Sequence, residues 1–325
     1  MKTIRFAAAL LSALTLAAAA QTDQQPFQTP ALLIREDGTF QRAWLVSATK
    51  SAVRYRETAV ATETVDAKLS EFKSVFLFEP REYAAALDLY QSRKYAEARQ
   101  AFAAIAARFN PIYQIENSHA ALAAFYEMEC LRQLGDLDRL AAALEKFDKS
   151  PLTRETQLRQ VELYLLWDAV RTKSWDSLEK LAAERAKTRL PGDQRAQVAY
   201  CHGLALEGLE KPEQALFAYQ TAMTADTGAS EVVARQAALR VMAILSADAE
   251  VAKAMKDWGT PAQNKNSNGY AKLAEAAAVA ALFQATLGAG APLPAEFKDL
   301  PNYRPKEEEP EKKEEPEKKE EPEKK

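Results

Sequence analysis

The spacing of apolar residues changes along the chain and divides most of it into four stretches. Residues 31–80 alternate apolar and polar positions in short runs, which is typical of β-strands. Residues 81–257 repeat apolar positions every three or four residues, as amphipathic helices do. Residues 258–305 hold a polar loop, an Ala-rich apolar run and an extension with Gly and Pro, whereas residues 306–325 contain only Glu, Lys and Pro.

The helical pattern is clearest in Tyr200–Asp226, where two helices are expected to meet at a turn. Pro212 falls in the first turn of the second helix, where its missing N–H costs little. Gly203 leaves a place on the first helix where a neighbour can approach closely. Three residues of the second helix share one face at i, i+4 and i+7: Ala215, Tyr219 and Ala222. One such hairpin cannot bury its apolar face alone, so we expect copies to stack.

The small residue, turn, Ala, aromatic residue and second Ala of this segment resemble a tetratricopeptide repeat. Similar patterns cover residues 82–111, 119–151, 154–191 and 230–257, with turn-side anchors at Ala98, Leu140, Leu178 and Ala215. The anchors are spaced more widely than the usual repeat of about 34 residues, so the helices or loops are longer. The resemblance implies a mainly α fold, a TPR-like α-solenoid over residues 81–257.

Residues 31–80 predict a small all-β, barrel-like domain in front of the helices. A strand–turn–strand signal surrounds Asp37-Gly38, and two further strands (AVRYRE and ATETV) precede a closing strand, SVFLF. The pattern resembles an SH3-like or Sm-like module. We expect Phe40, Trp44 and Tyr55 in its core. The module either caps the first repeat or binds a ligand of its own.

The sequence of residues 258–325 predicts a segment that caps the end of the helical stack, followed by a tail. After a polar loop at 259–269, residues 270–287 form an Ala-rich helix that is apolar nearly all round, which indicates burial as the last helix of the stack. Residues 288–305 are expected to pack back over it. Residues 306–325 contain the repeat EEPEKK three times and cannot form a core, so they predict a disordered tail.

The N-terminus has the features of a secretory signal. Residues 1–20 join a positive start to a short apolar run that ends in Ala18-Ala19-Ala20, and residues 21–30 read as a linker. The mature chain is therefore expected to be exported, to the periplasm or outside the cell, with no integral membrane span after signal cleavage. The alternative is an uncleaved anchor.

The net charge limits which partners are expected, and the positions of the cysteines indicate whether a disulfide is expected. The net charge is −3, and the tail alone, with ten Glu and seven Lys, accounts for it. Without a basic field, nucleic acid is not an expected partner. Cys130 and Cys201 are the only cysteines. They fall in hairpins that are not neighbours, so we expect two buried free thiols and no disulfide.

Catalytic patterns are not found in the sequence. The two histidines, His119 and His202, each stand alone in a helical pattern, and an enzyme would have to depend on one of them. No zinc spacing, phosphate-binding loop or nucleophile elbow occurs. We therefore expect no cofactor, no metal and no enzymatic activity.

The tetratricopeptide resemblance implies a concave groove lined by the first helix of each hairpin. Aromatic residues beside single charges in that position suit peptide recognition. The projected groove residues are Tyr83, Tyr90, Glu129, Arg132, Trp167, Arg171, Tyr200 and Glu207.

The expected function is an exported, non-catalytic protein–protein interaction scaffold of the cell envelope, with a protein or peptide held in this groove. The alternative is a structural protein that binds a cell-wall or envelope polymer through the β module and the charged tail.

Overall fold

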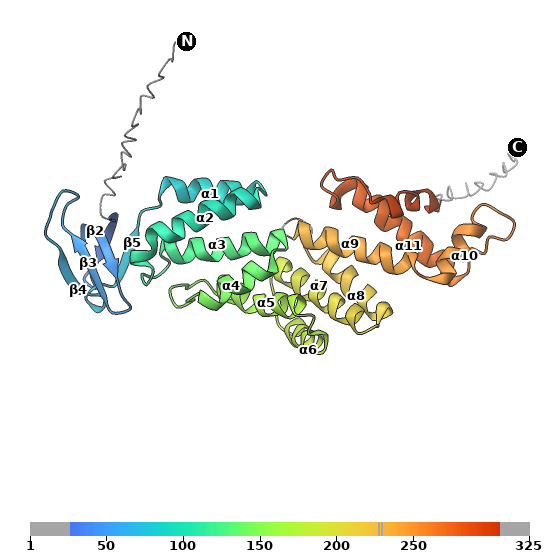
Figure 1. Ribbon diagram of the computed structural model, residues 1–325, viewed down its shortest axis with the longest axis horizontal. Helices are drawn as coiled ribbons and strands as arrows, with labels where there is room; N and C mark the ends of the chain where they lie inside the picture. The colour runs from blue at the N-terminus through green and yellow to red at the C-terminus, as the bar shows by residue number, and fades with distance from the viewer. Residues whose placement is uncertain (1–26, 227, 229, 306–325) are drawn as a thin grey trace, which may run out of the picture.

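The computed structural model describes residues 27–226, 228 and 230–305, and this part of the chain is mainly α-helical with a small sheet at one end (Figure 1). The expected signal peptide at 1–20, most of the expected linker at 21–30 and the expected tail at 306–325 lie outside the described residues.

Five antiparallel strands form the sheet: β1 (Thr29–Ile34), β2 (Phe40–Ala48), β3 (Ala52–Arg56), β4 (Val65–Lys68) and β5 (Ser74–Leu77). Their order across the sheet is β4-β3-β2-β1-β5. The turn between β1 and β2 confirms the Asp-Gly signal. Gly38 has a φ of +81°, and the Asp37 carboxylate accepts hydrogen bonds from the backbone N–H and the hydroxyl of Thr39.

The expected barrel is wrong in one respect, because the described strands form an open sheet. β4 and β5 lie at opposite edges and do not pair with each other. The fourth strand also begins later than expected. Tyr55 pairs with Val65, so β4 starts at the last residue of the run ATETV, and residues 57–64 connect it to β3.

One aromatic residue of the sheet, Phe40, lies on a different face than expected. Ala43 and Leu45 of β2 point to the buried face, so Phe40 must point to the other face, because strand side chains alternate. Phe40 is accordingly 70% exposed and not in the core. Tyr55 is buried as expected, and Trp44 is half-buried on the same face as Phe40.

Eleven α-helices follow in the described chain: α1 (Arg81–Gln91), α2 (Tyr95–Phe109), α3 (His119–Leu134), α4 (Leu137–Lys146), α5 (Glu155–Arg171), α6 (Trp175–Ala186), α7 (Gly192–Gly208), α8 (Pro212–Ala225), α9 (Glu231–Ser246), α10 (Ala249–Asp257) and α11 (Asn268–Leu282). Each helix contacts the next one along the chain. The odd-numbered helices also contact one another in series, from α1 to α11.

The hairpin turns lie where the sequence predicts them. Gly135 ends α3 in the left-handed conformation, and the Asp136 carboxylate caps α4 by accepting a hydrogen bond from the Arg139 N–H. The four anchors are all buried: Ala98, Leu140, Leu178 and Ala215. A β-carbon on Gly203 would lie 2.4 Å from Cε1 of Tyr219, so the expected close approach at this glycine is confirmed.

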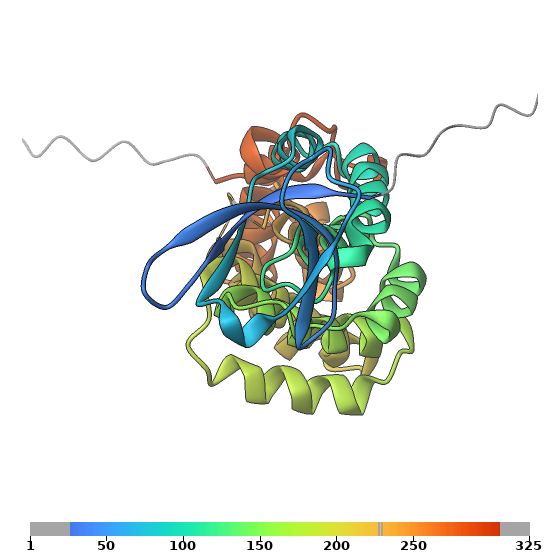
Figure 2. The ribbon, with the colours of Figure 1, turned by 90° about the vertical axis from the view of Figure 1, so that its left-hand side faces the viewer.

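Two hydrophobic cores meet at α3. Ala120, Ala123 and Cys130 belong to the core that includes the inner face of the sheet, with α1 and α2. Phe125 and Met128 belong to the core that runs on through α11. The sheet therefore covers the apolar N-terminal end of the helices, and Figure 2 shows it in front of them.

The C-terminal segment packs back over the last helix, as expected. α11 continues into a π-helical turn, η3 (Phe283–Leu287), and two short 3-10 turns follow, η4 (Ala295–Phe297) and η5 (Leu300–Tyr303). η5 contacts α11, and Phe297 and Leu300 are buried in its core. Trp258 stacks on Tyr270, and Tyr303 meets the edge of the same indole.

Replacing Gly203 with Ala tests the close packing of α7 on α8. The new methyl group would overlap the Tyr219 ring, and overpacking costs about 1–3 kcal/mol. The higher helix propensity of Ala stabilises the helix by only about 1 kcal/mol relative to Gly. We expect a net loss in the free energy of unfolding, measured by urea denaturation.

Gly228→Ala is the matched control, because a β-carbon at that position would have its nearest neighbouring atom 3.8 Å away. Its effect should stay within about 0.5 kcal/mol. Equal stability of the two variants would contradict the close contact at Gly203.

Candidate functional site

The eight predicted groove residues differ in exposure. Tyr83, Glu129, Arg132, Trp167 and Tyr200 are buried, Tyr90 and Glu207 are half-buried, and Arg171 is exposed. Most of these side chains bind one another or their helix neighbours. They form a buried polar network on the odd-numbered helices. The sequence identified these residues but not the residues that they bind.

The centre of this network is an ion pair within α3. Glu129 and Arg132 are both 7% exposed and lie one helical turn apart. Nη2 of Arg132 is 2.8 Å from Oε2 of Glu129, and its Nε is 3.1 Å from Oε1, so the contact is bidentate. The Tyr164 hydroxyl of α5 donates to Oε1 at 2.6 Å, and the Tyr90 hydroxyl of α1 donates to Oε2 at 3.4 Å. The pair thus joins three helices.

The protonation states of the pair follow from these contacts. Burial acts to raise the pKa of Glu129, but the charge and hydrogen bonds of Arg132 and the Tyr164 hydroxyl outweigh it and leave the pKa below its ordinary value. Burial likewise acts to lower the pKa of Arg132, and the Glu129 charge reverses this and raises it. Both side chains are therefore ionised at neutral pH.

The network continues from α3 to α7 through α5. The Arg132 guanidinium lies 6.0 Å from the centre of the Trp167 ring. The Trp167 indole N–H donates to the Gln197 amide oxygen at 3.1 Å, and the amides of Gln160 and Gln197 exchange two hydrogen bonds of 3.0 Å. These contacts satisfy polar groups that would otherwise be costly to bury.

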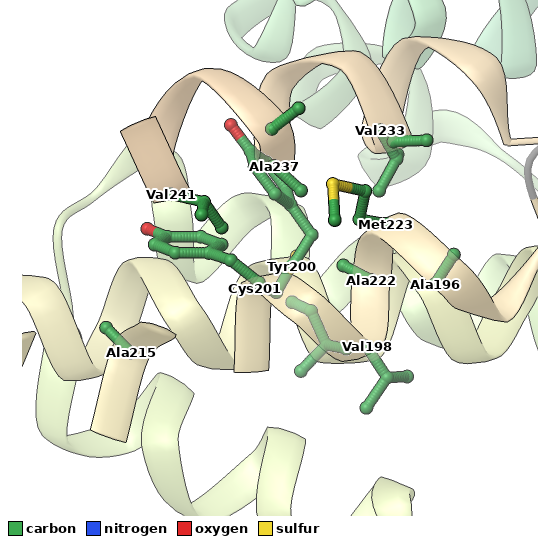
Figure 3. Close-up of a cluster of buried hydrophobic side chains, with 14 of the residues drawn as sticks. Ala196, Val198, Tyr200, Cys201, Ala215, Ala222, Met223, Val233, Ala237 and Val241 are labelled. Atoms are coloured by element: carbon green, nitrogen blue, oxygen red, sulfur yellow. The ribbon is translucent and has the colours of Figure 1, made fainter. Parts of the chain in front are cut away.

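Further along the odd-numbered helices, Tyr200 lies in the apolar core with residues of α7, α8 and α9 (Figure 3). Its ring is 6.0 Å from that of Trp167 and 5.8 Å from that of Tyr219. The Tyr219 hydroxyl donates to Oε2 of Glu207 at 2.7 Å, and Nη1 of Arg240 donates to Oε1 at 3.1 Å. Both carboxylate oxygens of Glu207 therefore have partners.

Two ion pairs define the edges of this region. Arg171 lies 2.8 Å from Asp168 and 3.5 Å from Asp138, on the surface between α4 and α5 and away from the buried network. Arg93, in the turn between α1 and α2, pairs with Glu231, the first residue of α9. This second pair brings distant hairpins together.

Glu207 also lines a cleft that the sequence did not predict. The cleft has a volume of about 350 Å³ and lies where α7, α8, α9 and α11 come together. Leu216, Ala243 and Ile244 provide apolar lining. Such an apolar cleft with a few polar groups suits the side chain of a bound peptide.

The charged rim of the cleft is fixed by Lys272 of α11. Its ammonium group lies 2.6 Å from Asp248 and 3.2 Å from Glu213. Lys272 stands 59 residues from Glu213 in sequence, so no local pattern connects them.

Each histidine contacts residues of neighbouring parts of the fold. His119 has Nε2 3.0 Å from the Phe78 carbonyl oxygen, and its ring contacts Tyr83 and Phe109. Burial lowers its pKa. His202 lies 4.0 Å from Glu179 of α6, and burial lowers its pKa as well. The structure does not place the two histidines against each other.

Cys130 and Cys201 are both buried and form no disulfide in the described chain. Burial raises the pKa of the Cys130 thiol to about 12. Burial raises the pKa of the Cys201 thiol as well, so both thiols remain protonated at neutral pH.

No described helix is both long enough and apolar enough to cross a membrane. Comparison of the chain with family models, curated proteins and solved structures finds no match. The function is therefore inferred from the arrangement of its residues.

Glu129→Gln tests the buried pair. The substitution leaves the Arg132 charge buried without a carboxylate, and breaking such a pair costs about 3–5 kcal/mol. The loss should appear in the free energy of unfolding from urea denaturation. Asp168→Asn is the matched control, because its partner Arg171 is also three residues away but exposed. We expect less than about 1 kcal/mol there.

A triple apolar variant, Glu129→Leu with Arg132→Met and Tyr164→Phe, removes the charges and the hydroxyl together. It should recover most of the stability, because apolar replacements of buried pairs are often neutral. Equal losses in Glu129→Gln and Asp168→Asn would show that the pair is not desolvated.

The pH dependence of stability follows from the lowered pKa of Glu129. A carboxyl whose pKa is lower in the folded state stabilises the fold above its ordinary pKa of 4.5. That contribution is lost as the pH falls through the folded-state pKa. Wild type should therefore lose more stability than Glu129→Gln on acidification below about pH 4.5, in thermal melts followed by circular dichroism. Parallel pH profiles would contradict the assignment.

Proposed function

We propose that the chain is an exported, non-catalytic scaffold that binds a segment of another protein of the cell envelope. In this proposal the hairpins stack as a TPR-like α-solenoid, and the sheet is a small SH3-like cap on its first repeat. The serial contacts of the odd-numbered helices support the stacking. The sequence of residues 1–20 supports export.

The observation that carries the proposal is the cleft at α7, α8, α9 and α11. The inner polar residues nearest α3 already satisfy one another, so they offer few free groups to a partner. Apolar surface remains accessible at the cleft, beside Leu216 and Ile244. A partner would insert an apolar side chain there and place polar groups against the rim of Glu207, Glu213 and Lys272.

This proposal keeps one part of the groove predicted from sequence and changes the rest. Glu207 stays in the proposed site because it lines the cleft, where its carboxylate also accepts hydrogen bonds from Tyr219 and Arg240. Glu129, Arg132 and Trp167 act as structural residues that hold α3, α5 and α7 in place.

Ala243→Trp is the variant that tests the cleft. Ala243 is exposed on α9 and lines the cleft, so an indole there fills the space without entering the core. Chemical crosslinking in cells followed by mass spectrometry should recover partners with wild type and lose them with Ala243→Trp.

Ala107→Trp is the matched control, because Ala107 is an exposed alanine near the end of α2. It should retain the wild-type partners, and thermal melts should show both variants folded. Partners that are retained by Ala243→Trp would contradict binding at the cleft.

A further inference from the structure

The outer face of the sheet is apolar although no described element covers it. The inner face packs on the helices through Leu33, Leu45 and Tyr55. An antiparallel sheet with one packed face usually presents polar side chains on the other. Here the outward positions hold Leu32, Ile34, Phe40, Trp44 and Phe76, which we call the outer patch. In Figure 2 the sheet lies nearest the viewer, with the helices behind it.

The outer patch includes two highly exposed aromatic side chains. Ten large apolar side chains are highly exposed in the described residues, and two of them, Phe40 and Phe76, belong to the outer patch. Phe40 is 70% exposed and Phe76 is 52% exposed. Phe78 follows β5 and meets the edge of the Phe76 ring at 5.4 Å. Exposed aromatic side chains that lie close together are typical of an interaction surface.

Strand register shows the shape of the outer patch. Leu32 pairs with Arg42 on one side and with Phe76 on the other, and Ile34 pairs with Phe40. The apolar side chains therefore extend over β5, β1 and β2. Adjacent strands are about 4.8 Å apart, so three strands span about 10 Å. This is the diameter of an α-helix with its side chains.

Positive charge borders the outer patch on the β2–β3 side. Arg42 lies over the Trp44 ring at 5.0 Å, and Trp44 pairs with Arg56 of β3. Arg54 is already neutralised by Asp66, with contacts of 2.7 and 3.0 Å. In the described chain neither Arg42 nor Arg56 has a carboxylate partner within 4.0 Å, and the Arg56 guanidinium donates a hydrogen bond of 3.4 Å to the Gln28 amide oxygen. The β5 side of the patch has no such cation within Ser74–Leu77.

We propose that the outer patch binds an amphipathic helix of a partner protein whose apolar face is flanked by acidic residues. The apolar face would lie across β5, β1 and β2, and the acidic flank would point towards Arg42 and Arg56. Helix-on-sheet packing is a standard way to bury such a face. This site is separate from the cleft, so either site can fail without the other.

A strand added to the β5 edge fits the observations less well. Such a strand would lie three strand spacings from β2, about 14 Å from Arg42. It would leave Phe40 and Trp44 uncovered. The position of the exposed aromatic residues favours a ligand on the face of the sheet over one at its edge.

Selection from a random 16-residue peptide library displayed on phage tests the proposal with the full chain as bait. Phe40→Ser combined with Phe76→Ser is the counter-selection bait. Both side chains are exposed, so the fold should survive, as a thermal melt will show. Phe217→Ser is the matched control, because Phe217 of α8 is also 70% exposed.

Peptides enriched on wild type and on Phe217→Ser, but not on the double variant, should repeat apolar residues at i, i+3, i+4 and i+7 with Asp or Glu on one flank. Arg42→Glu should weaken their binding by about tenfold or more, equivalent to about 1.4 kcal/mol. Arg81→Glu, at an exposed position in α1, should change it less than about twofold.

Four results would overturn the proposal. Enriched peptides with alternating apolar residues would indicate strand addition at β5, and basic flanks would contradict the role of Arg42. No enrichment that depends on Phe40 and Phe76 would contradict the site itself. Self-association through the same residues, seen by sedimentation velocity, would show that the occupant is a second copy of the chain.

Discussion

The structure depends on the burial of α3 between two hydrophobic cores. Most helices here have one apolar face, but α3 contributes Ala123 and Cys130 to the core under the sheet and Phe125 and Met128 to the core of the later helices. A helix buried on both sides cannot be removed without exposing both cores. The sheet and the helical hairpins are therefore expected to unfold as one cooperative unit and not as two modules.

Burial on both sides also explains the ion pair. The part of α3 that faces α1 and α5 carries Glu129 and Arg132, and in an apolar interior either charge alone would cost several kcal/mol. Their bidentate contact and the Tyr164 hydroxyl fix the positions of α1 and α5 relative to α3. We infer that the pair contributes specificity of packing more than net stability. The interior is then occupied by structural contacts, so both binding sites that we propose lie on the surface.

Local patterns in the sequence predicted the helices, their turns and the small buried anchors, because these depend on spacing within about 40 residues. They did not predict contacts between hairpins that are distant in sequence. Arg93 pairs with Glu231, although the two residues are far apart in the sequence. No periodic pattern of residues predicts that contact. The same limit applies to Lys272 at the cleft. Alternation in β2 identified two faces, but it did not tell which one Phe40 occupies.

Native-state hydrogen exchange of the full chain, followed by mass spectrometry across a series of low urea concentrations, tests the central position of α3 most directly. If α3 joins both cores, its amides should exchange only through global unfolding, and β1–β3 and α5–α7 should lose protection in the same event. Exchange of the sheet while α5–α7 remain protected, or exchange of α3 before either flank, would contradict this account.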